Sequence, residues 1–290
     1  MSLEEINRQL ADLAPSTTTD VPQLGVRVHV ALSPAPPAAV VFDPMLYLVF
    51  QGAKRLLLGA REIRYGAGDL VTTAVHIPAL AEVVVASAER PYRALEIPFD
   101  RQLVSALIAE LGELSPAPAE AVSVHPLPAP VLDPVFRLLK LAGDPGAARI
   151  LADGVKREIW YRILTGPNGA TFIDLTRTNS VLGRVHEVTT WMRGHLGEPF
   201  DAGHVAALAN VSVTSLYRLF KAATGESPGS YHKRLRLMEG RRRVAERSDT
   251  IQRIAATVGY ASPAQFTRDY RRLFGAAPTI DFPLSAPLPR

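Results

Sequence analysis

The sequence predicts an α+β protein of two domains, in which a β-rich domain is followed by an all-helical domain. Three observations predict this order. Short segments rich in Val, Ile, Leu and Tyr, separated by turn residues, fill residues 24–98. Helical periodicity replaces them after Asp100. Near the C-terminus, one helical segment occurs in two similar copies. Many short strands at close spacing are typical of a β-barrel or a sandwich.

Composition limits the class of protein. With 290 residues, 47% of them apolar, the chain can fill two hydrophobic cores. It contains no cysteine, which excludes disulfides, zinc fingers and thiol chemistry. The N-terminal segment MSLEEINRQLADL is charged and lacks the apolar core of a secretion signal, and no apolar run is long enough to span a membrane. We therefore expect a protein of a reducing cytoplasm without membrane contact.

The charge is unevenly distributed along the chain. Residues 181–290 hold 16 Lys and Arg against 9 Asp and Glu, whereas the first 180 residues hold 16 against 19. A basic C-terminal third beside a mildly acidic remainder favours nucleic acid as a partner of that third. Because many basic surfaces are only solvated, charge alone leaves this interpretation open.

The organisation of the chain follows from its periodicities. Ser2 and Glu5 form a capping box for a first helix over 2–13, which a linker-like run, PSTTTDVP, follows. Further helices are expected over 101–114, 131–142 and 145–165, with a Pro- and Ala-rich connector over 115–130. We expect an N-terminal helix and linker (1–22), a β-rich domain with a helical extension (23–175) and a helical domain (179–290).

The duplicated segment is the strongest signal. Residues 215–228 read SLYRLFKAATGESP and residues 265–278 read QFTRDYRRLFGAAP. At an offset of fifty the matching pairs are Ala206/Ala256, Leu208/Val258, Ser212/Ser262, Leu216/Phe266, Arg218/Arg268, Phe220/Tyr270, Lys221/Arg271, Gly225/Gly275 and Pro228/Pro278. Two unrelated amphipathic helices would not keep arginine, glycine and proline in one register. The pattern indicates an internal repeat.

Each unit has the signals of two helices joined by a turn. Asp201 is expected to cap a short helix, Asn210 to adopt the left-handed turn after it, and Ser212 to cap a second helix. Gly259 and Ser262 take the corresponding places in the second unit. Both units are therefore predicted to be helix-turn-helix motifs.

The second helix of each unit is amphipathic, and its polar face is suited to DNA. Leu216, Phe220 and Ala223 share one face, which turns Tyr217 and Arg218 away from the core. The basic segment 227–247 lies between the units, and 20 residues of helix span about 30 Å. That length is close to the roughly 34 Å between successive major grooves on one side of B-DNA. We expect the second helix of each unit to contact bases, each in one of two successive major grooves.

These segments resemble the AraC/XylS family of bacterial transcription regulators. The resemblance rests on two stretches within about 185–281, LYRLFKAATGESPGSYHKRLRL and IAATVGYASPAQFTRDYRRLFGAAP. DPMLYLVFQGAKRLLLGAREIRYGAGDLVTTAVHIPA and RPYRALEIPFD are similar to a sensor-domain subtype of the family. The resemblance implies a cupin-like β-barrel that often binds a small effector, helices that form a homodimer, and a bipartite domain that binds double-stranded DNA. RNA polymerase would be a further partner of an activator.

The resemblance also implies which residues contact DNA. Those expected in the first unit are Ser212, Thr214, Tyr217, Arg218 and Lys221, and in the second Ser262, Ala264, Gln265, Thr267, Arg268, Arg271 and Arg272. By position, Thr214, Tyr217 and Arg218 would meet bases in one groove, and Ala264, Gln265 and Arg268 in the other. Ala264 departs in character, since it offers only a methyl contact, and looser specificity is expected there.

The β-rich half offers a weaker candidate site. Polar residues that could line an effector pocket are Tyr47, Gln51, Lys54, Tyr65, His76 and Glu96. The simpler interpretation is strand alternation, in which polar side chains face water. His29, His76 and His125 do not form the tight cluster with a carboxylate that a metal cupin needs, so no metal and no cofactor are expected.

Two other functions stay open at this point. One is a cupin-like enzyme that processes a small molecule and carries a DNA-binding appendage, although no nucleophile motif frames the Ser, His and Asp residues. The other is a DNA-binding dimer without an effector, whose barrel serves only to dimerise. The preferred interpretation is a sequence-specific transcription regulator without catalysis.

Overall fold

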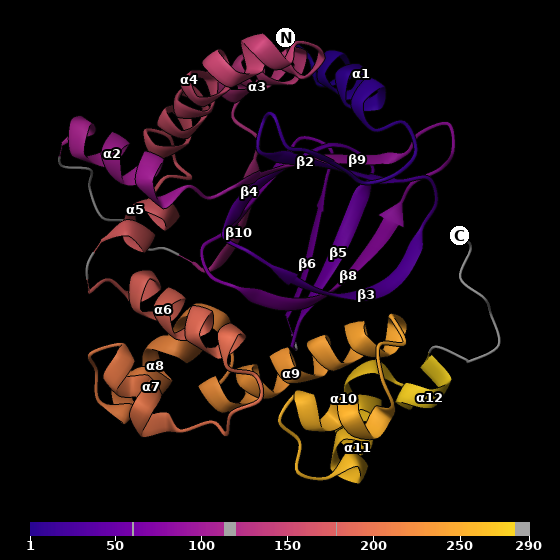
Figure 1. Cartoon of the computed structure of the whole chain (residues 1–290). Helices are drawn as coiled ribbons and strands as arrows, with labels where there is room; N and C mark the ends of the chain where they lie inside the picture. The colour runs from indigo at the N-terminus through magenta and orange to yellow at the C-terminus, as the bar shows by residue number, and fades with distance from the viewer. Residues whose placement is uncertain (60, 113–119, 178, 282–290) are drawn as a thin grey trace.

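A computed structural model describes residues 1–59, 61–112, 120–177 and 179–281. The last nine residues of the expected helical domain and part of the expected connector lie outside the described residues. Figure 1 shows the strands in the middle of the molecule, with α1, α3 and α4 on one side and α6 to α12 on the opposite side. The chain thus has a sheet-rich N-terminal part followed by a helical C-terminal part, as predicted.

The elements have the following bounds. The strands are β1 (Thr19–Val21), β2 (Val26–Ala31), β3 (Ala35–Phe42), β4 (Met45–Gln51), β5 (Ala53–Leu58), β6 (Arg61–Gly66), β7 (Asp69–Thr73), β8 (Ile77–Val85), β9 (Tyr92–Pro98) and β10 (Val122–Pro126). The helices are α1 (Leu3–Leu13), α2 (Arg101–Leu111), α3 (Ala129–Lys140), η1 (Leu141–Gly143), α4 (Pro145–Leu164), α5 (Ala170–Thr176), α6 (Val181–Gly194), α7 (Ala202–Leu208), α8 (Val213–Thr224), α9 (Pro228–Ala245), α10 (Ile251–Thr257), α11 (Pro263–Phe274) and α12 (Pro278–Asp281).

Two antiparallel sheets enclose the N-terminal core. Their strand orders are β1-β2-β9-β4-β7-β10 and β3-β8-β5-β6. Strand β4 lies between β9 and β7, and its residues from Met45 to Phe50 are buried. A strand buried on both faces reads as a continuous apolar run, which explains the sequence MLYLVF.

The predicted capping box of the first helix is confirmed. Two segments that were expected to be loops contain strands instead. The Ser2 N–H donates to Glu5 Oε2 (2.7 Å), and the Glu5 N–H donates to Ser2 Oγ (3.3 Å). The linker-like run ends in β1, which pairs with β2, and the connector contains β10, which pairs with β7. Both strands are short and sit at sheet edges beside prolines, so their local sequences carry little strand signal.

Helix α4 places its largest apolar residues inside the subunit. From sequence, the apolar side chains of Trp160 and Leu164 fit a dimer interface and burial within one subunit equally well; they are 1% and 2% exposed. The Trp160 ring packs edge-on against Phe172 of α5 at 4.8 Å between centroids. Helix α5 itself was not anticipated from the sequence. An intersubunit contact would have to use the other face of α4.

The C-terminal helices form the two predicted units, α7–α8 and α10–α11, with a one-residue difference in register. Asn210 (φ 52°) and Gly259 (φ 80°) adopt the left-handed turn, and they lie 49 positions apart. In the first helices Ala206 is equivalent to the buried Ala255, so the expected pairing with the exposed Ala256 is wrong. The second helices keep the offset of fifty, because the turn before α11 is one residue longer.

Helix α9 joins the units and belongs to both of their cores. Tyr231 and Leu235 pack with the large core of the barrel and the first unit, whereas Leu237 and Val244 pack with a separate core of the second unit. None of the helices in the described ranges is long and apolar enough to cross a membrane.

Candidate nucleic-acid interface and effector site

The second helices of the two units, α8 and α11, have the same length and the same types of capping residue at both ends. The Ser212 hydroxyl accepts from the Ser215 N–H (3.2 Å), and the Ser262 hydroxyl accepts from the Gln265 N–H (3.4 Å). Gly225 and Gly275 end the helices with φ values of 81° and 84°. Side-chain caps and left-handed glycines fix both ends of a helix. The two serines therefore orient the helices through their own backbones.

The outer faces of α8 and α11 carry most of the sequence-predicted DNA-binding residues. The exposed members are Ser212, Thr214, Tyr217, Arg218, Lys221, Ala264, Gln265, Arg268, Arg271 and Arg272, while Ser262 and Thr267 are half-buried. Within the described part of the chain no ion pair involves the five basic members of this set. Among the described residues, no carboxylate forms an ion pair with these solvent-facing charges.

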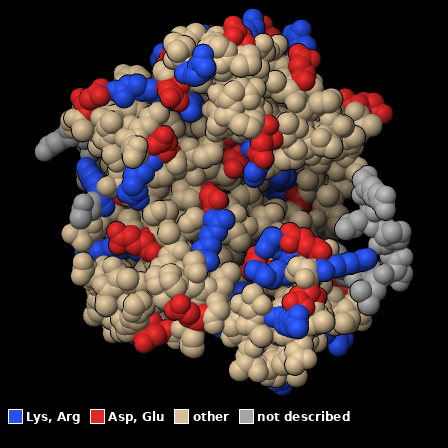
Figure 2. Space-filling view, in the orientation of Figure 1, with Lys and Arg blue, Asp and Glu red and all other residues tan. Residues whose placement is uncertain are grey.

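The arginines of α9 contrast with those of α8 and α11. Arg242 lies between Glu239 (2.7 Å) and Glu246 (2.6 Å), which raise its pKa. Arg241 pairs with Asp281 of α12 (2.9 Å). On the face drawn in Figure 2, basic side chains over α9 and α10 are accordingly interspersed with acidic ones. Unpaired positive charge is concentrated on α8 and α11 rather than on the helix that links them.

Several of the predicted pocket residues meet inside the barrel. Lys54 Nζ donates to Tyr47 Oη (2.9 Å), and Tyr92 Oη bonds the same oxygen (3.1 Å). The Tyr65 ring packs edge-on to Tyr47 at 6.1 Å, and Glu96 pairs with His29 (2.6 Å). We call these six residues the polar cluster. Tyr92 and His29 were not predicted to belong to this site, although strand alternation places both side chains on the inner face.

Burial sets the protonation of the polar cluster. It lowers the pKa of Lys54 to about 8, although the Glu96 charge acts in the opposite direction. It raises the pKa of Tyr65 well above its usual value and lowers that of His29. A buried ammonium that faces phenols, while the Glu96 carboxylate is engaged by His29, is a group that attracts anions.

Two predicted pocket residues lie elsewhere. Gln51 is at the edge of the barrel, where its side-chain oxygen accepts from Asn7 of α1 (2.6 Å). His76 is outside the barrel interior, because it sits between the barrel and the helical domain. Its Nδ1 lies 2.8 Å from Asp43 and 3.0 Å from Arg193 Nη1, and its ring stacks on His186. The expectation that His76 belongs to the same pocket as Lys54 is wrong.

This junction holds the helical domain against the barrel. Arg193 of α6 pairs with Asp43, and the Tyr231 hydroxyl of α9 donates to the His76 carbonyl. Burial lowers the pKa of His186 to about 4, so the His186 ring is uncharged near neutral pH. Charged and hydrogen-bonded groups of both domains thus meet at a few points.

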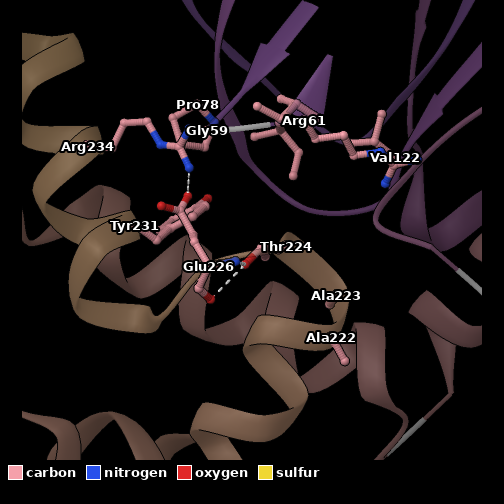
Figure 3. Close-up of a pocket in the computed structure, with 13 residues that line it drawn as sticks. Gly59, Arg61, Pro78, Val122, Ala222, Ala223, Thr224, Glu226, Tyr231 and Arg234 are labelled. Carbon is pink, nitrogen blue, oxygen red and sulfur yellow. Dashed lines mark hydrogen bonds and ion pairs between the residues drawn. The ribbon is translucent and has the colours of Figure 1, made fainter. Parts of the chain in front are cut away.

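A cavity of about 460 Å³ lies beside the junction. We call it the interdomain cavity. The barrel lines it with Leu58, Gly59, Arg61, Ile77, Pro78 and Val122, and the helical domain with residues 222–226, Tyr231 and Arg234. Figure 3 shows Arg234 and Glu226 directed toward each other beside Tyr231, with Arg61 and Val122 on the barrel side. The sequence gives no signal for this cavity, because its two walls are a hundred or more residues apart along the chain.

No group of three or more His, Cys, Asp or Glu side chains that could hold a metal ion occurs in the residues described.

Comparisons with known protein families match both parts of the chain. Residues 22–171 match the model of the AraC-type transcriptional regulator N-terminus, and residues 205–280 match a helix-turn-helix domain. The chain is 34% identical over 95 residues to the HTH-type transcriptional regulator GbdR of Pseudomonas aeruginosa, covering 33% of this chain and 26% of GbdR. It is 32% identical over 94 residues to the HTH-type transcriptional activator RhaS of Pectobacterium carotovorum, covering 32% and 34%.

These matches span about a quarter to a third of the two curated relatives. Solved structures extend the likeness to the whole fold. Apo ToxT of Vibrio cholerae superposes with a TM-score of 0.56 at 11% identity, covering 91% of this chain and 97% of ToxT. An unsaturated fatty acid bound form of ToxT gives a TM-score of 0.55 at 11% identity, with 88% and 92% covered. At this identity the likeness concerns the fold alone.

Proposed function

Because the chain belongs to the AraC-type family of transcriptional regulators, we propose that it reads double-stranded DNA with α8 and α11 in successive major grooves. The observation that carries this proposal is that the basic residues of these two helices are exposed and form no ion pair with any residue that the structure describes. Helix α9 has 18 residues, which corresponds to about 27 Å at 1.5 Å per residue. The domain limits proposed for this function are 1–22, 23–175 and 179–290.

The residues of each reading helix divide into two roles. Arg218 and Arg268 would each bridge O6 and N7 of a guanine, which is worth about 1–3 kcal/mol of discrimination. Lys221, Arg271 and Arg272 would hold phosphates, since they lie near the C-terminal ends of the helices. The remaining polar members of the set would complete base readout beside the arginines.

The test of this function is selection of DNA by the full chain. Rounds of binding from a random library should enrich one bipartite sequence, and that sequence should bind at least about a thousandfold more tightly than the unselected library. Absence of any enriched sequence, with weak binding to every fragment, would contradict the proposal.

We further propose that the protein responds to a small-molecule effector held in the interdomain cavity. Its volume lies within the roughly 300–1,000 Å³ of small-molecule sites, and its walls come from both domains. Arg61 pairs with Glu120 across an exposed contact of 3.2 Å, which is worth about 0–1 kcal/mol, so a ligand carboxylate could replace Glu120 at low cost. The polar cluster around Lys54 is the second candidate for the effector-binding site.

One of the ToxT structures has an unsaturated fatty acid bound, which is a carboxylate with an apolar body. Leu58, Ile77 and Val122 would accommodate such a body in the interdomain cavity. We therefore propose a carboxylic acid with an apolar body as the class of effector for this chain. The alternative function is a DNA-binding dimer that has no effector. In that case no acid of this class would bind in the interdomain cavity or in the polar cluster.

We propose that the protein is a homodimer through the outer face of α4. Ile150, Leu151 and Tyr161 are 73%, 51% and 42% exposed, and shallow grooves lie on both sides of Gly154. Replacing Leu151 by Arg should convert a dimer into a monomer in sedimentation, whereas Asp153→Arg on the same helix should not. A wild-type monomer at micromolar concentration would contradict this assembly.

We propose that the regulator acts in the cytoplasm without catalysis, and that RNA polymerase is its partner only if it activates. The rival function is a cupin-like enzyme with a DNA-binding appendage. Metal analysis of the pure protein and turnover screening with small molecules separate the two functions, because the rival requires a bound metal or measurable turnover.

A further inference from the structure

The two helix-turn-helix units are joined by more than the continuous helix α9. Their hydrophobic cores are separate, since Leu235 belongs to the first core and Leu237 to the second. Two residues on the same turn of α9 therefore pack in two different hydrophobic cores. A single helix shared in this way sets the distance between the units but restrains twisting and bending between them less well.

Arg236 lies between these two leucines and contacts both units. Its Nη1 donates to the carbonyl of Gly259 (3.3 Å), which forms the turn of the second unit. Its Nη2 donates to the carbonyl of Glu198, in the loop that leads into the first unit. The guanidinium thus connects two segments that are 61 positions apart, while its Cα is fixed in α9.

The surrounding backbone is packed closely around this side chain. A Cβ added at Gly259 would lie 2.7 Å from Arg236 Nη2 and 2.8 Å from the Gly197 carbonyl oxygen. A Cβ at Gly197 would in turn lie 3.4 Å from the carbonyl of Thr257, at the end of α10. Gly259 also needs its positive φ of 80°. The loop before the first unit and the turn of the second unit therefore meet at Arg236.

We propose that Arg236 is a positioning residue that fixes the angle between the two units, and so sets the spacing of the two DNA half-sites that the protein accepts. The proposal rests on the two-groove function proposed above. Its planar, forked donors can hold two carbonyls at once, which a lysine ammonium on a flexible stem does less rigidly. Because Arg236 is half-buried on α9 and its donors are engaged by backbone carbonyls, its loss should leave α8 and α11 intact.

The experiment compares Arg236→Gln and Arg236→Lys with wild type, with Arg242→Gln as the matched control on the same helix. Each protein is titrated with single half-sites and with selected operators whose half-sites are moved by one or two base pairs. We expect Arg236→Gln to bind single half-sites as wild type does. It should bind the native spacing about tenfold more weakly, since linkage of two sites depends on geometry, and its preference among spacings should flatten.

A second measurement tests the same inference without DNA. The chain contains no cysteine, so Lys221→Cys and Arg271→Cys give two unique positions for spin labels on the two reading helices. The label-to-label distance distribution should broaden in Arg236→Gln, remain partly narrow in Arg236→Lys and match wild type in Arg242→Gln. An unchanged distribution together with an unchanged spacing preference would overturn the proposal. Failure of wild type to bind any half-site would instead overturn the proposed function, while the spin-label result would still decide the role of Arg236.

Discussion

Single side chains in this molecule differ in function according to their partners rather than their type. Arg242 and Arg218 are both exposed arginines on helices of the same domain. Arg242 lies between two glutamates, whereas no ion pair of the described residues involves Arg218. A phosphate would have to compete with Glu239 and Glu246 for Arg242. Arg242 is therefore a suitable control for Arg218.

Lys54 provides a prediction at the same scale. Its pKa falls from 10.5 to about 8 in the folded chain, so between these values the unfolded chain binds more protons. Stability should therefore rise with pH over this window. In Lys54→Met this contribution is absent. Urea denaturation should show the stability of the variant relative to wild type falling by about 2 kcal/mol between pH 7 and pH 9.5. Parallel profiles for the two proteins would show that Lys54 is not desolvated.

The helix-turn-helix units show what could be predicted at the scale of elements. Caps, left-handed residues and the exposed faces of α8 and α11 follow from local sequence, because side-chain caps and helical periodicity are local rules. The one-residue shift in the first helices was missed, since Ala206, Ala255 and Ala256 are chemically identical and only packing distinguishes them. Strands β1 and β10 were missed because tertiary pairing, rather than propensity, makes them strands.

The close contact between α9 and α11 gives a second prediction. A Cβ at Gly240 would lie 2.7 Å from Cε2 of the fully buried Phe266. Gly240→Ala should therefore destabilise the second unit by about 1–3 kcal/mol, as overpacking does. At Gly229 of the same helix a Cβ would meet the Phe200 ring at an ordinary 3.6 Å. Gly229→Ala should be close to neutral in the same urea denaturation. Equal effects of the two changes would contradict the close packing of these helices.

At the scale of the whole molecule, the barrel and the DNA-binding helices touch through Asp43, His76, Arg193 and Tyr231. Neither this junction nor the interdomain cavity could be predicted from the sequence. The residues that the two domains contribute are a hundred or more positions apart, and no motif marks them. An occupant of the interdomain cavity would contact both domains, which provides a physical route from effector binding to DNA affinity.

A cavity-filling variant tests that route. With 9-decenoate as the probe, wild-type protein should gain thermal stability, because a ligand that binds only the folded state stabilises it. Ala222 is exposed and lines the interdomain cavity, so Ala222→Phe should abolish the gain. Ala256→Phe, at an exposed position of α10 outside the lining, should retain it. Equal shifts in all three proteins would place the probe elsewhere, with the polar cluster as the next candidate.

The most direct test of the central claim uses the two equivalent arginines. Arg218→Ala and Arg268→Ala are each put through binding selection on randomised operators, with Arg242→Ala as the control. Each loss should relax the preference at one base pair, and the two relaxed positions should lie about 10 base pairs apart, one helical turn of DNA. Arg242→Ala should relax none. Relaxation at the same position in both variants, or an even loss of affinity without any change in preference, would contradict a protein that reads two successive major grooves.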